Sequence, residues 1–196
     1  MVNVRSGSVV GVLAVQGDFE KHLRVLASRG THAHEVRTAG DLEGLSALVI
    51  PGGESTTMTR VLEGGLREPL LDFCRKHPVW GTCAGMIMLG RPIPDPRVRT
   101  LSLMDVEVER NGFGRQVHSF EADLRVAEDL GEAEKPLRGV FIRAPRITRM
   151  GKSVRPLVWL DDEPVCVQEG HILASSFHPE LTDDARLHVY FLSLGA

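Results

Sequence analysis

The sequence has only three cysteines, no long apolar run and no excess of basic residues. Cys74, Cys83 and Cys166 are odd in number and far apart, which argues against a disulfide framework or a zinc ribbon and favours a reducing cytoplasm. No segment approaches the roughly 20 apolar residues of a membrane span, and the apolar run at residues 9–15 is too short for a signal peptide. The net charge is -3 and the basic residues are scattered, so no nucleic-acid-binding surface is indicated. We expect a cytoplasmic protein with neither a membrane nor a nucleic-acid partner.

Length and composition favour one compact domain that covers residues 1–196. The chain is 42% hydrophobic, and a chain of this length buries roughly 70% of the surface that it exposes when unfolded. Strand-like apolar runs alternate with helical patterns, which predicts an α/β fold with a mostly parallel sheet and helices on both faces. We expect helices at residues 18–29, 56–63, 66–76 and 183–194. We expect strands at residues 8–15, 34–37, 47–51, 79–80, 104–109, 140–142, 158–160, 165–168 and 172–177, and a surface loop at residues 91–96.

The pentapeptide Gly-Thr-Cys-Ala-Gly at residues 81–85 lies between two apolar runs. Glycines two positions before and after a central residue permit a sharp strand-to-helix turn, which lifts that residue out of the sheet and aims the next backbone N–H at a developing oxyanion. Cys83 would also lie at a helix N-terminus, where the helix dipole favours the thiolate. The pentapeptide alone is equally typical of a buried cysteine between packing glycines, so a catalytic interpretation needs a partner base.

His178 is the candidate for that base. The apolar run at residues 172–177 predicts a strand that leads into His178-Pro179-Glu180. Side chains alternate along an extended segment, so His178 and Glu180 are expected on one face, and Pro179 favours an extended His178. The imidazole would take the thiol proton, while the carboxylate would hold its tautomer and stabilise the imidazolium. A lone histidine would be more typical of an exposed loop, but this one has an orienting carboxylate and an upstream elbow cysteine.

Three further segments are expected beyond the carboxyl ends of the strands, where parallel α/β sheets bind ligands. Residues 51–57 combine two glycines with polar groups at a helix start, although the same segment suits a plain turn in which Ser55 caps the helix. Residues 110–116 form a second polar loop, and residues 141–145 end a third strand at Arg143. Arginine is well suited to bind a carboxylate through two hydrogen bonds, although a single arginine is more often a surface residue.

Gly-Thr-Cys-Ala-Gly with a C-terminal Ser-Phe-His-Pro-Glu resembles the class I glutamine amidotransferase family. Five segments, in order over nearly the whole chain, are similar to the glutaminase subunits of pyridoxal 5'-phosphate synthases: residues 11–18, 51–57, 108–116, 140–145 and 176–184. This resemblance implies a flavodoxin-like, three-layer α/β sandwich. It also implies a subunit that hydrolyses L-glutamine and delivers the ammonia to a separate (β/α)₈-barrel synthase subunit for vitamin B6 synthesis. We expect neither a cofactor nor a metal.

The resemblance also implies a role for individual residues. Cys83 is the expected nucleophile, and His178 and Glu180 complete the triad. The backbone N–H groups of Gly53 and Ala84 are expected to form the oxyanion hole. The expected contacts with L-glutamine are Gly53, Glu54, Ser55, Arg110, Ile142 and Arg143.

Two other classes of protein compete with this interpretation. A protease or a deglycase-like protein can carry an elbow cysteine on the same scaffold, but the loop at residues 51–57 and the His-Pro-Glu sequence do not fit that pattern. A regulatory domain that has lost its chemistry is disfavoured by the intact set of Cys83, His178 and Glu180. Residues 91–100 fall where the family is variable, and the acidic segment at residues 119–136 has no assignment.

Overall fold

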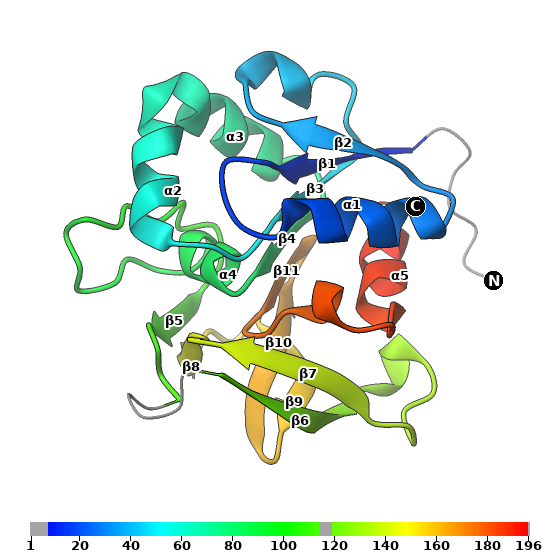
Figure 1. The fold of residues 1–196 in the computed structure, drawn as a ribbon. Helices are drawn as coiled ribbons and strands as arrows, with labels where there is room; N and C mark the ends of the chain where they lie inside the picture. Colours follow the sequence, from blue (N-terminus) through cyan, green and yellow to red (C-terminus); the bar gives the residue numbers. More distant parts are fainter. Residues whose placement is uncertain (1–7, 114–118, 196) are drawn as a thin grey trace.

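The computed structural model describes residues 8–113 and 119–195, which form a central sheet between two layers of helices (Figure 1). The strands in these ranges are β1 (Val9–Leu13), β2 (His32–Val36), β3 (Ala47–Ile50), β4 (Val79–Thr82), β5 (Val106–Glu109), β6 (Ser119–Val126), β7 (Leu137–Ile142), β8 (Arg146–Met150), β9 (Arg155–Leu160), β10 (Glu163–Glu169) and β11 (Ile172–Ser175). The α-helices are α1 (Phe19–Ser28), α2 (Ser55–Val61), α3 (Arg67–Cys74), α4 (Ala84–Leu89) and α5 (Arg186–Ser193). None of the helices in the described ranges is long and apolar enough to cross a bilayer.

The main sheet has nine strands in the order β2-β1-β3-β4-β11-β10-β9-β6-β7. The strands from β2 to β11 in this order pair in parallel, as the alternation of strands and helices predicts. The strands from β11 to β7 pair in antiparallel, and β5 and β8 form a separate antiparallel pair. The predicted three-layer α/β class is confirmed, with the parallel pairing confined to one half of the sheet.

Two hydrophobic cores lie on the two faces of this sheet, because alternate residues of each strand face opposite sides. Val49 of β3 packs in the core that contains residues of α1 and α5. Its neighbours Leu48 and Ile50 pack in the other core, with residues of α2, α3 and α4. Figure 1 shows the same division, with α1 and α5 on one side of the sheet and α2, α3 and α4 on the other. The buried strands therefore read as nearly continuous apolar runs, as expected for a sheet covered on both faces.

The parallel strands all end at one edge of the sheet, and this edge positions the functional residues. β1, β3, β4 and β11 are neighbours with the same direction. The segments that leave their carboxyl ends therefore meet in space, although they are far apart in the sequence. These segments begin at residues 14, 51, 83 and 176.

Most of the expected elements are present, with local reasons for the differences. The helix predicted at residues 183–194 begins at Arg186, because the Asp184 side chain accepts from the Arg186 backbone N–H at 3.0 Å and holds the preceding chain outside the helix. The α-helix predicted at residues 56–63 ends at Val61, before Gly64 and Gly65 depart from helical geometry. β6 and β8 were not predicted, since both expose much of their length and carry polar side chains there. Residues 91–96 form the expected loop.

Candidate active site

Cys83 lies at the sharp turn between β4 and α4. Its backbone N–H donates to the Ser175 carbonyl oxygen at 2.8 Å, and its φ of 49° and ψ of −108° are unusual for a residue with a side chain. Such a conformation costs about 1–3 kcal/mol and persists only where the surrounding structure enforces it. The flanking glycines are required by direct contact. A Cβ on Gly81 would lie 2.5 Å from the Gly85 carbonyl carbon, and a Cβ on Gly85 would overlap the Ile50 carbonyl oxygen.

His178 and Glu180 reach the same edge from β11, the parallel neighbour of β4. The His178 backbone N–H donates to the Val140 carbonyl oxygen at 2.8 Å, and His178 Nδ1 lies 2.7 Å from Glu180 Oε1. Residues Pro179–Leu181 form a 3₁₀ turn. The prediction of one extended segment is therefore wrong for Glu180, because a turn, and not the alternation of a strand, brings the carboxylate to the imidazole.

The charges of this pair support each other in a buried setting. Burial by itself would lower the pKa of His178, but contacts with Cys83 and Glu180 outweigh it and raise the pKa well above its usual range. Burial by itself would raise the pKa of Glu180, but His22 and the hydrogen bond with His178 outweigh it and hold the pKa below its usual range. The arrangement therefore favours an imidazolium on His178 beside an ionised Glu180.

The loop after β3 packs directly against Cys83 and His178. A Cβ on Gly52 would lie 2.5 Å from His178 Cε1 and 3.2 Å from Cys83 Cβ, so only a glycine fits there. Gly53 has a φ of 152°, a region that favours glycine. On the other side of Cys83, its Sγ lies 3.8 Å from the Ile142 carbonyl oxygen, to which the thiol donates.

One hollow of about 330 Å³ brings the predicted site residues together. Its volume is in the range of small-molecule sites. Cys83 and His178 open into it, while Glu180 lies behind His178 and does not line it. The other predicted residues that line the hollow are Gly53, Glu54, Ser55, Ala84, Arg110, Ile142 and Arg143. Of the polar loop predicted at residues 110–116, residues 114–116 lie outside the described ranges.

Glu54, and not Ser55, caps the helix that follows the glycine loop. The Glu54 carboxylate accepts from the Thr57 backbone N–H at 3.0 Å and from the Thr56 hydroxyl. Burial would raise the pKa of Glu54, but these hydrogen bonds and Arg110 lower it. Ser55 is 2% exposed and lines the hollow, and its hydroxyl has no hydrogen-bond partner among the described residues. The alternative in which Ser55 serves only as the cap is therefore wrong.

The two predicted arginines differ in their surroundings. Arg110 donates to Glu54 Oε1 at 3.1 Å and to Asp95 Oδ2 at 2.6 Å. Arg143 has a φ of 45°, follows β7 and forms no ion pair within the described ranges. Asp95 belongs to the segment at residues 91–100, so this segment reaches the site through Arg110. The sequence contained no local signal for that contact.

Two buried histidines, His22 of α1 and His188 of α5, extend the site behind Glu180. His22 Nε2 lies 3.3 Å from Glu180 Oε2, and His22 Nδ1 lies 3.1 Å from His188 Nε2. Both histidines are 0% exposed. Neither was predicted as a site residue. A histidine on the otherwise apolar face of a helix was the only signal that His22 offered.

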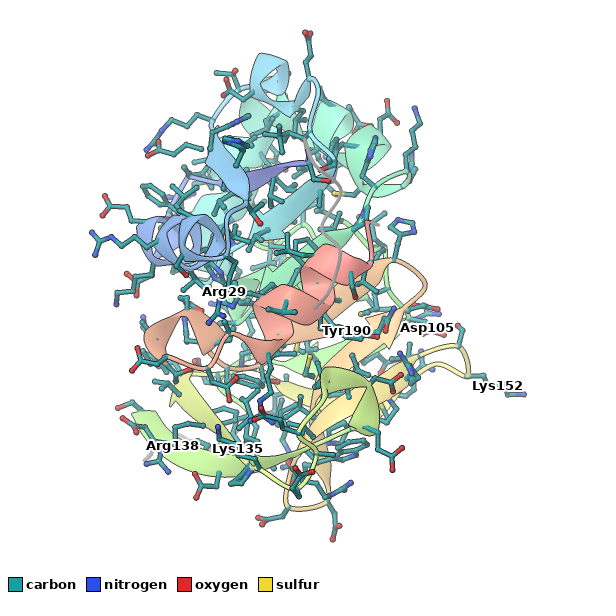
Figure 2. All side chains as sticks on the ribbon, turned by 90° about the vertical axis from the view of Figure 1, so that its right-hand side faces the viewer. Arg29, Asp105, Lys135, Arg138, Lys152 and Tyr190 are labelled. Atoms are coloured by element: carbon teal, nitrogen blue, oxygen red, sulfur yellow. The ribbon has the colours of Figure 1, made fainter. Side chains whose placement is uncertain are left out.

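A larger hollow, of about 940 Å³, lies elsewhere on the molecule, between α5 and the β6–β7 region. Arg29, Lys135, Arg138 and Tyr190 line it, and Figure 2 labels them on that face. Cys83 and the other predicted site residues do not line it. Within the part of the chain that the structure describes, no group of three or more His, Cys, Asp or Glu side chains is arranged to hold a metal ion.

Comparison with known proteins agrees with this geometry. The model of the SNO glutamine amidotransferase family matches residues 12–194. The chain belongs to the SNO glutamine amidotransferase family. Relatives within the family are named pyridoxal 5'-phosphate synthase subunit PdxT. The protein from Deinococcus radiodurans is 51% identical over 94% of this chain and 96% of its own, and the one from Thermus thermophilus is 53% identical over 95% and 97%.

Solved structures place the SNO-family chain in the same fold class. A crystal structure described as a glutamine amidotransferase superposes with a TM-score of 0.88 at 47% identity, over 96% of this chain and 99% of its own. A second glutamine amidotransferase, from Thermotoga maritima, superposes with a TM-score of 0.61 at 15% identity, over 90% of this chain and 77% of its own, which shows the fold alone. The predicted class I glutamine amidotransferase-like fold is confirmed.

Proposed function

We propose that this SNO-family chain is the glutaminase subunit of a pyridoxal 5'-phosphate synthase, and that residues 1–196 act as one glutaminase domain. It hydrolyses L-glutamine to L-glutamate and ammonia for the synthesis of vitamin B6. The observation that carries this proposal is the strained cysteine elbow, with His178 and Glu180 behind it and a hollow of amino-acid size in front. The names of the relatives support the synthase context.

The proposed reaction begins with attack of the Cys83 sulfur on the carboxamide carbon of glutamine. The thiol proton already lies on His178 Nε2, the ring nitrogen that does not contact Glu180, so the attacking group is a thiolate beside an imidazolium. The tetrahedral oxyanion is met by the backbone N–H groups of Ala84 and Gly53. The Ala84 group is available because it lies in the first turn of α4, where N–H groups have no partner within the helix. Removal of one such donor typically costs about 2.7–4 kcal/mol of transition-state stabilisation.

Collapse of the intermediate breaks the carbon–nitrogen bond, and the proton on His178 passes to the departing nitrogen, which leaves as ammonia. A glutamyl thioester remains on Cys83. His178 then accepts a proton from water, whose oxygen attacks the thioester carbon. The thioester carbon–sulfur bond then breaks, glutamate is released, and Cys83 is left as a thiolate beside the protonated His178. The buried Glu180 carboxylate stabilises the imidazolium in both steps.

The proposed glutamine-binding site uses the polar groups that line the hollow. Arg143 binds the α-carboxylate, since its guanidinium forms no ion pair within the described ranges. Arg110 is held by Asp95 and Glu54 and supplies a second positive charge. Glu54 presents a carboxylate to the α-ammonium group, and the Ser55 hydroxyl, which no described residue hydrogen-bonds, offers a further hydrogen bond. The remaining contacts are Gly53 and Ile142.

Alanine variants of the two arginines are expected to raise the KM for glutamine by about 10-fold or more with a small change in kcat. A lost hydrogen bond to a charged group typically costs about 1.5–3 kcal/mol, and the loss affects substrate binding and the transition state alike. Steady-state kinetics of Arg110→Ala and Arg143→Ala in the assembled complex would measure this. Arg149→Ala is the matched control, because Arg149 is partly exposed, pairs with Asp105 and Glu107, and lies outside the hollow. An unchanged KM in both site variants would contradict the assignment.

We propose that the ammonia is received by a partner, the (β/α)₈-barrel subunit of the synthase. Ammonia that escapes into neutral water becomes mostly ammonium, which is not a nucleophile, so its release needs to be coupled to a receiving site. The segment before α1 is well placed for such coupling. A Cβ on Gly17 would overlap the Gly52 carbonyl oxygen, and the Gln16 side chain packs against Gly53. A partner that contacts Gln16 and Gly17 therefore acts directly on the proposed oxyanion loop.

The function as a whole predicts that ammonia release from glutamine is low for the isolated chain and rises when the barrel subunit is added. Asparagine is the control substrate, and we expect little hydrolysis of it. One missing methylene alone discriminates by only about 1–3 kcal/mol. Asparagine is rejected more strongly because its α-carboxylate, once bound, holds the shorter side chain too far from Cys83. A coupled glutamate assay with and without the partner would measure both effects. Failure of the assembled complex to hydrolyse glutamine would reject the proposed function, and full activity of the isolated chain would reject the gating.

A further inference from the structure

The carboxylate of Glu180 is buried on all sides, and only one of its two oxygens is used by His178. The side chain is 0% exposed, and Oε1 accepts from His178 Nδ1 at 2.7 Å. Oε2 has no well-aligned hydrogen-bond donor among the described residues, and His22 Nε2 lies 3.3 Å from it. A buried carboxylate needs a partner for each oxygen to remain ionised at low cost. His22 is the group placed to supply the second one.

His22 is itself held by residues of two separate elements, α5 and β4. His188 of α5 contacts its Nδ1 at 3.1 Å, and the Thr82 hydroxyl of β4 lies 3.4 Å from its Nε2. The edge of the Trp80 ring system packs against His22 with ring centroids 5.7 Å apart. Thr82 also accepts from the Gly52 backbone N–H at 3.1 Å. The environment of His22 therefore joins the triad carboxylate to the loop that precedes the proposed oxyanion donor Gly53.

The pattern of partners assigns the protons in this network. An ionised Glu180 can only accept, so His22 presents Nε2–H to it, and His22 Nδ1 becomes an acceptor. His188 Nε2 then donates to His22 Nδ1, and His188 Nδ1 remains an unprotonated acceptor. That atom is buried without a partner within the described ranges. A doubly protonated His22 would instead leave an unpartnered N–H at His188 Nδ1, and buried orphan N–H groups are rarer than orphan acceptors.

We propose that His22 is a positioning residue of the catalytic triad: its Nε2–H holds the second oxygen of Glu180 and thereby fixes the orientation in which Glu180 presents its first oxygen to His178. This inference rests on the proposed function and adds a fourth member behind the triad. A histidine that served only to fill the core would not need a charged group beside it. His22 instead faces the buried carboxylate that the mechanism requires to be ionised.

The charged and titratable groups that face this network come from three elements. Glu180 lies in the 3₁₀ turn that follows β11, and His178 directly precedes that turn. His22 belongs to α1 and His188 to α5. Arg29, beyond the end of α1, adds a positive charge near His188. Burial is the largest cause that lowers the pKa of His188 far below its usual range, so His188 stays neutral. None of these groups therefore replaces the His22 N–H when it is lost.

The experiment compares His22→Leu with His22→Gln in the assembled complex. Leucine removes the donor, whereas the glutamine amide places an N–H near the position of Nε2. We expect His22→Leu to lower kcat by about 10- to 100-fold, by analogy with the loss of the outer partner of a metal-binding histidine, with little change in KM. The alkaline limb of the pH profile of kcat/KM should move to lower pH, because a carboxylate that His22 no longer holds in place raises the pKa of His178 less. His22→Gln should restore most of kcat and the position of the alkaline limb.

Leu26→Ala is the matched control, since Leu26 is 0% exposed in the same helix and lies outside the network. It should lower thermal stability and leave the pH profile unchanged. A second readout does not require glutamine: the pH dependence of iodoacetamide alkylation of Cys83 in the isolated chain, located by mass spectrometry, should change in His22→Leu and not in Leu26→Ala. This arm still decides the role of His22 if the wild-type complex hydrolyses no glutamine, an outcome that rejects the proposed function alone. A wild-type kcat and pH profile in His22→Leu, or a His22→Gln variant as impaired as His22→Leu, would overturn the inference.

Discussion

Replacement of Cys83 by alanine is expected to reduce glutamine hydrolysis by at least about 10⁴-fold, as for the loss of a nucleophile in other triads. Among the described residues that line the hollow, no other group can form the thioester, because Cys83 carries their only thiol. The substitution leaves the elbow intact. Alanine keeps the Cβ of cysteine, so the strain at a φ of 49° and the contacts of the flanking glycines are the same in both proteins. A loss of activity would therefore report the loss of the sulfur and not of the fold.

The other two cysteines supply matched controls for this experiment. Cys74 and Cys166 are both 0% exposed. Burial raises the pKa of the Cys74 thiol to about 12 and that of Cys166 still further, so neither forms a thiolate near neutrality. We expect Cys74→Ala and Cys166→Ala to lose some stability through core cavities and to keep their activity per folded molecule. Ammonia release measured beside thermal unfolding would separate these effects, and an active Cys83→Ala variant would reject the nucleophile assignment.

The elbow and the His-x-Glu pair could be predicted from the sequence because each depends on only a few consecutive residues. Two glycines at fixed spacing around Cys83 indicate a turn that side chains would obstruct, and the structure shows the contacts that obstruct them. The parallel order of β4 and β11 then brings Cys83 and His178 to one edge. The local geometry of Glu180 was still predicted incorrectly, because a strand and a 3₁₀ turn can present the same His-x-Glu pair.

The rest of the site depends on contacts between distant segments, for which the sequence offers no local signal. Asp95 lies in a proline-rich loop that resembles a surface linker, yet it binds Arg110 at 2.6 Å. His22 and His188 are 166 positions apart and meet only because α1 and α5 cover the same face of the sheet. β6 was missed for a different reason, because its residues 119–126 alternate polar and apolar, as is typical of a strand with one exposed face. Its apolar residues pack in or against a hydrophobic core, so here the sequence did contain a local signal.

Glu180→Gln is expected to lower kcat by about 10³- to 10⁴-fold while the KM for glutamine changes little, by analogy with the loss of the orienting carboxylate in serine-protease triads. Glutamine has nearly the same shape as glutamate and fits the same buried site. Its amide can present an N–H to His178 Nδ1, however, which places the imidazole proton on Nε2 and prevents that nitrogen from accepting the proton of Cys83. KM is preserved because Glu180 lies behind His178 and does not line the hollow.

The Glu180→Gln variant should also shift the pH dependence of kcat in a direction that a folding defect would not produce. The Glu180 carboxylate is one of the groups that raise the pKa of His178, after its contact with Cys83. Its replacement by a neutral amide lowers the pKa of His178. The imidazolium is then lost at a lower pH, and the alkaline limb of the kcat profile moves to lower pH. Glu163→Gln is the control, since Glu163 is exposed and pairs with Arg146 away from the site, and its profile should match that of the wild type. A Glu180→Gln variant with an altered KM but an unshifted alkaline limb would mean that Glu180 shapes the hollow and does not act through His178.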